Sequence, residues 1–156
     1  MTITLLQIGK TFFNYIEKGV EDYKQRINRY INFNIETYNL PQKFSKLPIH
    51  IQKEKEAEII LEKIKKFNYI ILLDEKGKQL SSVEFASKIN EITLRSYKKI
   101  VFIIGGPYGV TEDIKAKSDF IISMSKMTFS HQLIRLIFVE QLYRAFTIIN
   151  NEKYHH

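Results

Sequence analysis

Short apolar segments of strand length alternate with longer amphipathic segments along the whole chain. The strand-like segments are residues 2–8, 33–40, 69–73, 100–104 and the apolar run that ends before Met124. Apolar residues recur at helical spacing in residues 12–30, 52–66, 81–97, a short stretch after Thr111, and 131–150. Such alternation predicts an α/β fold, with a mostly parallel sheet and helices on both faces. The continuous apolar run at residues 69–73 is typical of a strand covered on both sides.

The composition limits the chain to one ordinary domain. It has 156 residues, of which 44% are hydrophobic, enough for one full core and too few for two. We therefore expect a single domain over residues 1–156. The absence of cysteine excludes disulfides and thiolate zinc sites. The 4 histidines are too scattered to suggest a metal cluster, so no metal is expected.

Neither end of the chain has the pattern of a membrane segment. The first ten residues lack the basic region and the cleavage site of a signal peptide, and they fit a first strand. Arg135, Glu140 and Arg144 interrupt the last apolar helix, and a bilayer would penalise these charges. These features predict a cytoplasmic protein.

Basic residues are in excess. Lys and Arg number 24 against 17 Asp and Glu, which gives a formal charge of +7. A phosphate-rich partner such as RNA would explain this excess, because surface cations gain from displacing condensed counterions. The alternative is that the basic side of the first helix is a solvated face without any partner.

Three shorter segments predict local structure. Residues 74–77 are typical of a turn, and Ser81 with Glu84 predicts a capping box for the helix that follows. Residues 41–50 combine proline, lysine and serine, which predicts an irregular, mobile loop. Thr111, followed by two acidic residues, predicts the cap of a short helix.

Two loops are predicted to meet at the carboxyl edge of the sheet, where open α/β folds bind ligands. The first contains Gly105, Gly106 and Gly109, and glycines let a ligand approach peptide groups without an obstructing side chain. The second, residues 124–130, offers hydroxyls, backbone groups and two methionine thioethers, which suit adenine or a sulfonium-bearing ligand. Neither loop is a GxGxxG fingerprint or a P-loop, which argues against dinucleotide and nucleoside triphosphate ligands.

The helix over residues 131–150 is apolar on almost every side and needs cover from more than one neighbour. Either it is central to the domain or its outer face is a subunit interface. We favour the interface, because a helix at the end of the chain lies more easily on the outside of a fold and two-fold dimers are the commonest oligomers. The segment that follows, NNEKYHH, is short, polar and aromatic.

Several separate motifs agree in order and spacing with one known family. They are ITLLQIGK, LLDEKGK, IIGGPYG, SKMTFSHQLIRLIFVEQLYRAF and the terminal KYHH. Together they resemble the RlmH family of ribosomal RNA large-subunit methyltransferases, a small branch of the SPOUT superfamily. The resemblance implies a homodimer formed through the C-terminal helix, and a C-terminal trefoil knot that holds S-adenosylmethionine. It also implies methyl transfer to N3 of a pseudouridine in 23S rRNA, within assembled ribosomes.

The resemblance also assigns cofactor contacts position by position. They fall on Leu73, Gly105, Met124, Ser125, Lys126, Met127, Thr128 and Phe129. All of them belong to the strand end and the two loops that the residue pattern marks as a pocket. Two positions depart from the family, since Ser130 stands where proline is usual and Tyr108 where a smaller polar or acidic residue is common.

Methylation of N3 requires a base for its proton, or stabilisation of the uracil anion that forms. Tyr154 and His155 of the tail are the first candidates, because in a dimer they could reach the pocket of the partner. His131 and Arg135 are second candidates, and the alternative role of His131 is to cap the helix. The alternatives for the whole protein are methylation of a ribose 2′-hydroxyl and a non-catalytic RNA-binding module.

Overall fold

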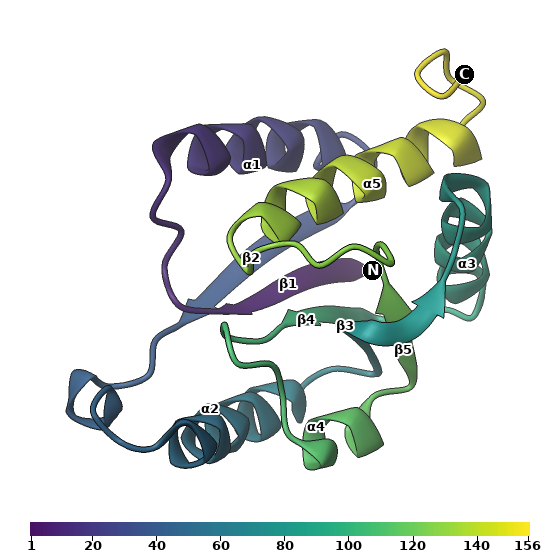
Figure 1. Cartoon of the computed structure of the whole chain (residues 1–156). Coiled ribbons are helices and arrows are strands. Elements are labelled where there is room, and N and C mark those ends of the chain that lie inside the picture. Colours follow the sequence, from purple (N-terminus) through teal and green to yellow (C-terminus); the bar gives the residue numbers. More distant parts are fainter.

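The computed structural model describes residues 1–156 and contains a sheet between two layers of helices (Figure 1). The strands are β1 (Thr2–Ile8), β2 (Asn32–Tyr38), β3 (Tyr69–Gln79), β4 (Lys99–Ile104) and β5 (Phe120–Ser123). The helices are α1 (Asn14–Ile27), α2 (Ile49–Ile64), α3 (Ser82–Leu94), α4 (Glu112–Lys117) and α5 (Leu133–Ile149), with a short 3-10 helix at Gln42–Phe44. The predicted alternation of strands and helices is confirmed.

The sheet is parallel throughout, in the strand order β2-β1-β4-β3-β5. The α/β fold predicted from the alternation of the two patterns is therefore confirmed. β1 and β4 pair near the centre, where Leu5 lies opposite Phe102. Because all strands point the same way, their carboxyl ends lie along one edge of the sheet.

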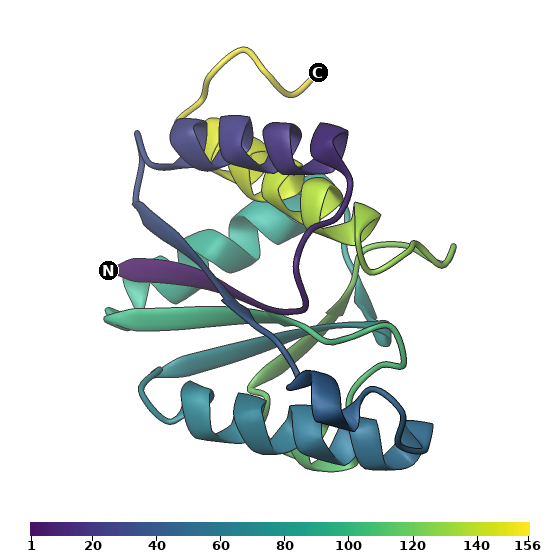
Figure 2. The same ribbon diagram turned by 90° about the vertical axis from the view of Figure 1, so that its left-hand side faces the viewer.

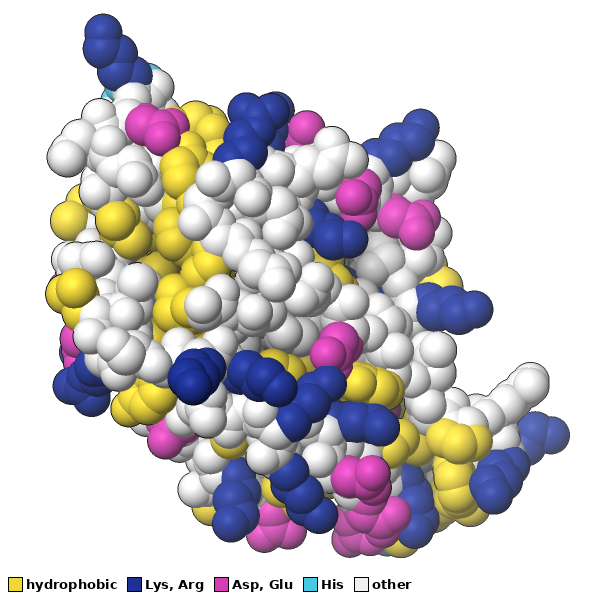
Figure 3. Space-filling model, turned by 180° about the vertical axis from the view of Figure 1, so that it is seen from behind, with side chains coloured by type: hydrophobic (Ala, Val, Ile, Leu, Met, Phe, Trp, Pro, Cys, Tyr) yellow, Lys and Arg dark blue, Asp and Glu magenta, His cyan; other side chains and the backbone are white.

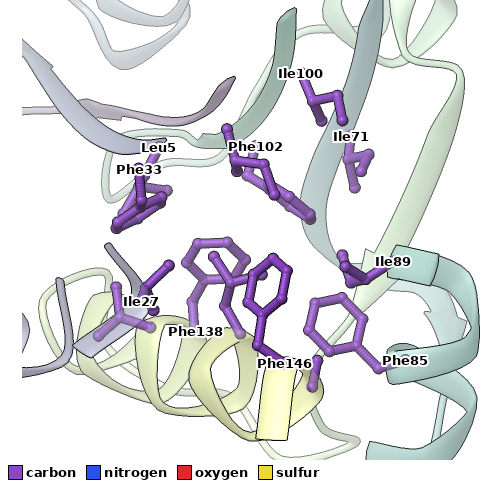
Figure 4. Packing of buried hydrophobic residues seen from close by; sticks show 14 of the residues in the cluster. Leu5, Ile27, Phe33, Ile71, Phe85, Ile89, Ile100, Phe102, Phe138 and Phe146 are labelled. Carbon is purple, nitrogen blue, oxygen red and sulfur yellow. The ribbon is translucent and has the colours of Figure 1, made fainter. Parts of the chain in front are cut away.

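Helices cover both faces of the sheet. α1, α3 and α5 form one layer, and α2 with α4 forms the other (Figures 1 and 2). Each layer closes its own hydrophobic core. The larger core lies under α1, α3 and α5 and is rich in aromatic rings, shown with their aliphatic neighbours in Figure 4, among them Phe33, Phe85, Phe102, Phe138 and Phe146. The smaller core lies under α2 and α4 and is aliphatic, with Ile60, Leu72, Ile103 and Ile114.

α5 lies in the middle of its layer, between α1 and α3 (Figure 1). Its inner face is buried, and the ring of Phe138 lies 4.7 Å from that of Phe102 in β4, measured between centroids. The helix is therefore covered within its layer by α1 and α3, and the favoured subunit interface on its outer face stays a prediction. Leu133, Ile134, Leu136, Ile148 and Ile149 are only partly buried although they pack against the larger core, and Ile137 is partly buried outside that core.

β3 is longer than the sequence predicts. The expected turn at residues 74–77 is wrong, because the strand continues to Gln79 and pairs again with β5. Its register shifts on the way, since Leu73 and Lys78 both lie opposite Ile122. The residues between them bulge away from the ladder, so polar residues that resemble a turn in sequence form an irregular part of the strand.

The remaining local predictions have mixed outcomes. The capping box is confirmed, since the Glu84 N–H donates to Ser81 Oγ over 3.2 Å and the Ser81 N–H donates to Glu84 Oε2 over 2.7 Å. Thr111 does precede α4, but its hydroxyl makes no capping bond and is buried without a partner. The segment expected to be irregular includes the 3-10 helix at Gln42–Phe44.

Charge is spread over the surface. Figure 3 shows Lys and Arg side chains in a band across the middle of the back face, with Asp and Glu among those below. None of the helices combines the length and the apolar character that a bilayer crossing needs. The back face of the molecule thus carries basic and acidic side chains together.

We predict that Gly77→Ala destabilises the fold more than an ordinary glycine substitution. A Cβ at Gly77 would lie 2.6–2.8 Å from backbone atoms of Ile121 and Ile122, and a paired strand cannot move aside easily. We expect the free energy of unfolding to fall by about 3 kcal/mol, as measured by urea denaturation. The control is Gly9→Ala, because a Cβ at Gly9 has no atom within 4 Å. Its only cost is the backbone strain of a φ of +81°, which should lower the free energy of unfolding by about 1 kcal/mol. Equal losses of unfolding free energy in Gly77→Ala and Gly9→Ala would contradict the close approach of Gly77 to the backbone of β5.

Candidate functional site

A cavity of about 430 Å³ opens at the carboxyl edge of the sheet. The ends of β3, β4 and β5 supply most of its wall, while α2 adds Lys53 and the start of α5 adds His131 and Ile134. Its size lies within the usual range of about 300–1,000 Å³ for small-ligand pockets. The two loops predicted to meet at this edge do meet there.

Most of the predicted cofactor residues line this cavity. They are Leu73, Gly105, Met124, Ser125, Met127, Thr128 and Phe129. Lys126 does not line it and its side chain points into solvent. Tyr108, one of the two departures from the family pattern, lies on the rim and is half exposed.

The loop after β5 is shaped by its own hydroxyl groups. Ser123 Oγ donates to the carbonyl of Ser125 over 2.9 Å, and Ser125 Oγ accepts from the Met127 N–H over 2.9 Å. Thr128 Oγ1 donates to Glu75 Oε2 over 3.2 Å, which ties this loop to β3. Hydrogen bonds of this local kind hold a loop in a turn conformation without regular secondary structure.

The glycine turn after β4 leaves no room for side chains. A Cβ at Gly105 would lie 2.6 Å from Val110 Cγ1, and one at Gly106 would lie 2.6 Å from Glu56 Oε2. Gly109 has a φ of +80°, a conformation that favours glycine. The turn thus presents backbone to the cavity.

Glu56 of α2 supports this turn from below and was not singled out by the sequence analysis. Its side chain is only 8% exposed and accepts a hydrogen bond from the Gly106 N–H. Burial raises the pKa of Glu56, and the Gly106 N–H and Lys53 act in the opposite direction. A signal was present in the sequence, because Glu56, Ile60 and Ile64 repeat every four residues, which places a carboxylate on the buried stripe of the helix.

His131 lines the cavity, and its neighbour determines which ring nitrogen carries the proton. The neighbouring Gln132 amide has a fixed orientation, because its Oε1 accepts from the Phe12 N–H over 2.8 Å and its Nε2 donates to the Lys10 carbonyl over 2.9 Å. The same Nε2 lies 3.2 Å from His131 Nε2, which must accept because an amide nitrogen only donates. Burial, with a smaller contribution from Arg135, lowers the pKa of His131, so the neutral ring carries its proton on Nδ1.

Arg135 lies in the core and does not line the cavity. Its side chain is 0% exposed, and it donates to the Ile8 carbonyl over 2.8 Å and to Thr11 Oγ1 over 2.9 Å. No carboxylate pairs with it, its Nε has no partner, and burial lowers its pKa to about 10. Arg135 therefore joins the end of β1 to the start of α5 and is not placed to touch a substrate in the cavity.

The tail residues lie at the opposite end of α5 from the cavity (Figure 1). Tyr154 Oη donates to Glu140 over 3.1 Å and lies 3.2 Å from Tyr23 Oη, and His155 Nδ1 lies 3.4 Å from Arg144. Burial, followed by the bond to Tyr23, raises the pKa of Tyr154. Glu140 follows Leu133 by only seven residues, about 10 Å along the helix at 1.5 Å per residue, so the tail folds back over α5. The structure thus places His131 in the cavity wall, whereas neither Tyr154 nor His155 lines the cavity of the same protomer.

Comparisons with known proteins agree over the whole chain. A family model described as predicted SPOUT methyltransferase matches residues 1–155. Two relatives named ribosomal RNA large subunit methyltransferase H, from Parabacteroides distasonis and Bacteroides thetaiotaomicron, are each 46% identical over 156 residues, covering 100% of this chain and 99% of each relative. A solved structure of a probable methylase family protein from Haemophilus influenzae has the same fold at a TM-score of 0.56 and 13% identity, over 99% of this chain and 70% of that one.

The parallel sheet, the cavity at its carboxyl edge and the family match define a SPOUT methyltransferase. Such enzymes have a C-terminal trefoil knot and use S-adenosylmethionine as the methyl donor, which is therefore the cofactor of this protein. With 46% identity to relatives over its full length, the chain belongs to the RlmH family.

The residues around the cavity fit S-adenosylmethionine. Met124, Met127 and Phe129 provide apolar and polarizable surface for an adenine ring, and the glycine turn lets backbone groups approach it. Charges of both signs line the cavity, among them Lys53, Lys115 and Asp74. This mixture suits a ligand that carries an amine, a carboxylate and a sulfonium, whereas a polyphosphate would favour a uniformly basic rim.

We predict that Glu56 positions the glycine turn for the cofactor. Glu56→Ala removes the acceptor of the Gly106 N–H, and we expect the Kd of S-adenosylmethionine to rise about tenfold by calorimetry, since a hydrogen bond to a charged group is worth about 1.5–3 kcal/mol. Glu56→Gln keeps an acceptor oxygen and should show an intermediate Kd.

The matched control is Glu58→Ala, which removes an exposed carboxylate of the same helix that pairs with Lys55. We expect this variant to bind S-adenosylmethionine like the unmodified protein. If Glu56→Ala lowers the melting temperature and leaves the Kd unchanged, the residue supports α2 alone and the prediction is wrong.

Proposed function

We propose that this protein transfers a methyl group from S-adenosylmethionine to N3 of a pseudouridine in 23S rRNA, acting on assembled ribosomes in the cytoplasm. The observation that carries the proposal is the 46% identity, over the full length, to proteins named ribosomal RNA large subunit methyltransferase H. The formal charge of +7 supports an RNA substrate.

The cofactor is assigned to the cavity at the carboxyl edge. Seven residues that line the cavity are proposed to contact the cofactor directly: Leu73, Gly105, Met124, Ser125, Met127, Thr128 and Phe129. Lys126 is proposed to act from the outer side of its loop. The bound cofactor supplies an electrophilic methyl group on a sulfonium. The chain's own part is to hold donor and acceptor in line, which by itself accounts for much of the acceleration of a two-reactant step.

Removal of the N3 proton is assigned to the tail. The two candidates near the start of α5, His131 and Arg135, are poorly suited to accept this proton. The lone pair of His131 Nε2 already accepts from Gln132, and Arg135 is buried and always protonated near neutral pH. Tyr154 and His155 are therefore proposed as the groups that take the proton or stabilise the uracil anion. Nδ1–H of His131 remains available to donate to the nucleotide or the cofactor.

This assignment requires a homodimer formed through α5. Within one protomer Tyr154 and His155 contact Glu140 and Arg144 of α5 and neither lines the cavity, so the tail is assigned to the cavity of a partner. Ile137 of α5 is only partly buried and packs against neither core, which supports an interface there. A two-fold axis across antiparallel α5 helices would carry each tail toward the partner's cavity.

The position of the new methyl group tests the proposed reaction. Ribosomes from a methylation-deficient strain, incubated with the protein and S-adenosylmethionine, should yield a methylated pseudouridine base on digestion and mass analysis. A methylated ribose in the same digest would support the 2′-hydroxyl as acceptor. Binding of ribosomes without any methyl transfer would support a non-catalytic RNA-binding module.

Deletion of residues 154–156 tests the tail. We expect methylation to fall by at least about 100-fold, the lower end of what general acid–base catalysis contributes. The Kd of S-adenosylmethionine should stay within about twofold, because the tail lies away from the cavity of its own protomer. Lys153→Ala, at an exposed position beside the deleted residues, is the control and should keep full activity. Normal turnover by the shortened chain would exclude the tail from catalysis.

A further inference from the structure

Exposed lysines gather at the amino edge of the sheet, where the strands begin, opposite the edge that holds the cavity. Figure 3 views the molecule from this side and shows Lys and Arg side chains in a band across its middle. Lysines at this edge that are exposed and form no ion pair are called the lysine ridge below: Lys65, Lys98, Lys99 and Lys117. Lys65 follows α2, Lys98 and Lys99 lie at the start of β4, and Lys117 ends α4.

The strand register places two members of the ridge on one level. Ile71 of β3 lies opposite Phe102 of β4 and also opposite Phe120 of β5. Lys99 and Lys117 each come three residues before these two partners, and only β3 lies between their strands. Two strand spacings amount to about 10 Å, so the long side chains of the ridge can contact the same stretch of a polyanion.

The ridge is built on backbone that the fold holds in place. The Lys99 N–H donates to Asn68 Oδ1 over 3.0 Å, and the Lys99 carbonyl accepts from the Asn68 N–H over 2.7 Å. The Lys98 carbonyl accepts from the Thr2 N–H over 2.9 Å. A segment that is ordered before binding loses little conformational entropy when a partner arrives.

Acidic side chains of the neighbouring elements do not neutralise the ridge. Glu36 and Glu91 pair with other basic residues, and Asp119 accepts from the Ile70 N–H over 2.7 Å. Glu62, near the end of α2, forms no ion pair, so the four lysines remain in excess over it. The ridge therefore keeps a positive charge.

Helix dipoles account for only part of the ridge. Cations stabilise the carboxyl ends of helices, and Lys65 and Lys117 stand at such ends. Lys98 and Lys99 belong to no helix, and their side chains have no ionic partner within the chain. Their charges are therefore available to a ligand.

The proposed dimer brings each ridge toward the cavity of the partner. α5 begins at the carboxyl edge, after His131 in the cavity wall, and it ends on the side of the chain's N-terminus (Figure 2). Two antiparallel α5 helices across a two-fold axis therefore bring the amino edge of each protomer to the carboxyl edge of the other. Lysine is depleted at subunit interfaces, so the ridge is poorly suited to be covered by the partner itself.

We propose that the lysine ridge of each protomer binds backbone phosphates of the substrate RNA and holds the RNA beside the cavity of the partner. The proposal rests on the proposed function, including its homodimer, and names a surface that recognises the substrate. Cations that neutralise phosphates release condensed counterions, which favours the binding of RNA. Such contacts position RNA without reading its sequence, so the choice of nucleotide is left to the cavity.

Removal of two charges from the ridge tests the proposal. Lys98→Gln combined with Lys99→Gln should raise the KM for ribosomes from a methylation-deficient strain about tenfold at about 0.1 M salt. The dependence of log KM on log salt should weaken by about 1.5, since each phosphate contact contributes about 0.7–0.9 to the slope. The kcat and the Kd of S-adenosylmethionine should stay within about twofold, because the ridge lies far from the cavity of its own protomer. Lys98→Arg with Lys99→Arg keeps both charges and should keep the KM.

Lys43→Gln combined with Lys46→Gln is the matched control. It removes the same number of charges from exposed lysines of the segment between β2 and α2, and it should leave the KM unchanged. An equal rise of the KM in the control would reflect net charge alone and would overturn the proposal. Sedimentation of each variant reports the oligomeric state, and a ridge variant that no longer dimerises would assign the ridge to the subunit interface and overturn the proposal as well.

Mixed dimers test which cavity the ridge serves. A protomer with Gly105→Val, whose side chain would collide with Val110, is paired with a protomer that carries Lys98→Gln and Lys99→Gln, and the mixed dimer is isolated with two affinity tags. Its one working cavity faces the intact ridge of the partner, so its KM should be near that of the unmodified protein. A KM as high as that of the ridge variant alone would show that the ridge serves its own protomer, and the proposal would be wrong. Gly106→Val replaces Gly105→Val if the latter does not fold.

Binding to labelled 23S rRNA, measured without S-adenosylmethionine, separates this proposal from the proposed function. Ridge-dependent binding of the RNA by a protein that methylates no ribosome would overturn the proposed function alone. Efficient methylation by the unmodified protein, with equal RNA binding by the glutamine variants, would overturn the ridge alone. In that second case a raised KM for ribosomes would assign the ridge to a ribosomal protein.

Discussion

One buried guanidinium joins the beginning of the fold to its end. Arg135 of α5 donates to the last carbonyl of β1 and to Thr11, and no carboxylate neutralises it. A buried charge held only by neutral acceptors is costly, so its bonds must be kept intact for the charge to be tolerated. Through them the start of α5 is fixed against the carboxyl end of β1, and the position of His131 in the cavity wall follows from that contact. The connection between β1 and α1 is fixed by the same residue through Thr11.

The site is thus assembled from segments far apart in the sequence. Strand ends contribute backbone and apolar surface, α2 contributes a carboxylate beneath the glycine turn, and α5 contributes a histidine whose proton is placed by a glutamine. Each contribution depends on the parallel arrangement, because only parallel strands bring successive loops to one edge. The cavity is a consequence of topology, and the side chains determine what it binds.

The sequence predicted the strands, the helices and the edge where the cavity lies, because apolar periodicity and glycine turns are local signals. It failed where a residue's role depends on a distant partner. The polar run at residues 74–77 resembles a turn, yet pairing with β5 extends the strand through it. Periodicity shows that α5 needs cover on several sides, but it cannot show that α1 and α3 provide it. Glu56 sits in an ordinary charged helix until Gly106 is placed above it. The motifs shared with the family supplied the proposed cofactor contacts residue by residue, whereas the residue pattern marked only the loops that hold them.

The central position of α5 has a consequence for the order in which the protein matures. β1, made first, pairs with β4, whose residues come almost a hundred positions later, so the sheet closes late in synthesis. The gap between α1 and α3 can be filled only after the final helix has been made, and His131 reaches its place in the same event. A chain that still lacks α5 therefore has its sheet strands but no complete donor site, and competence to bind the methyl donor requires the segment from His131 onward.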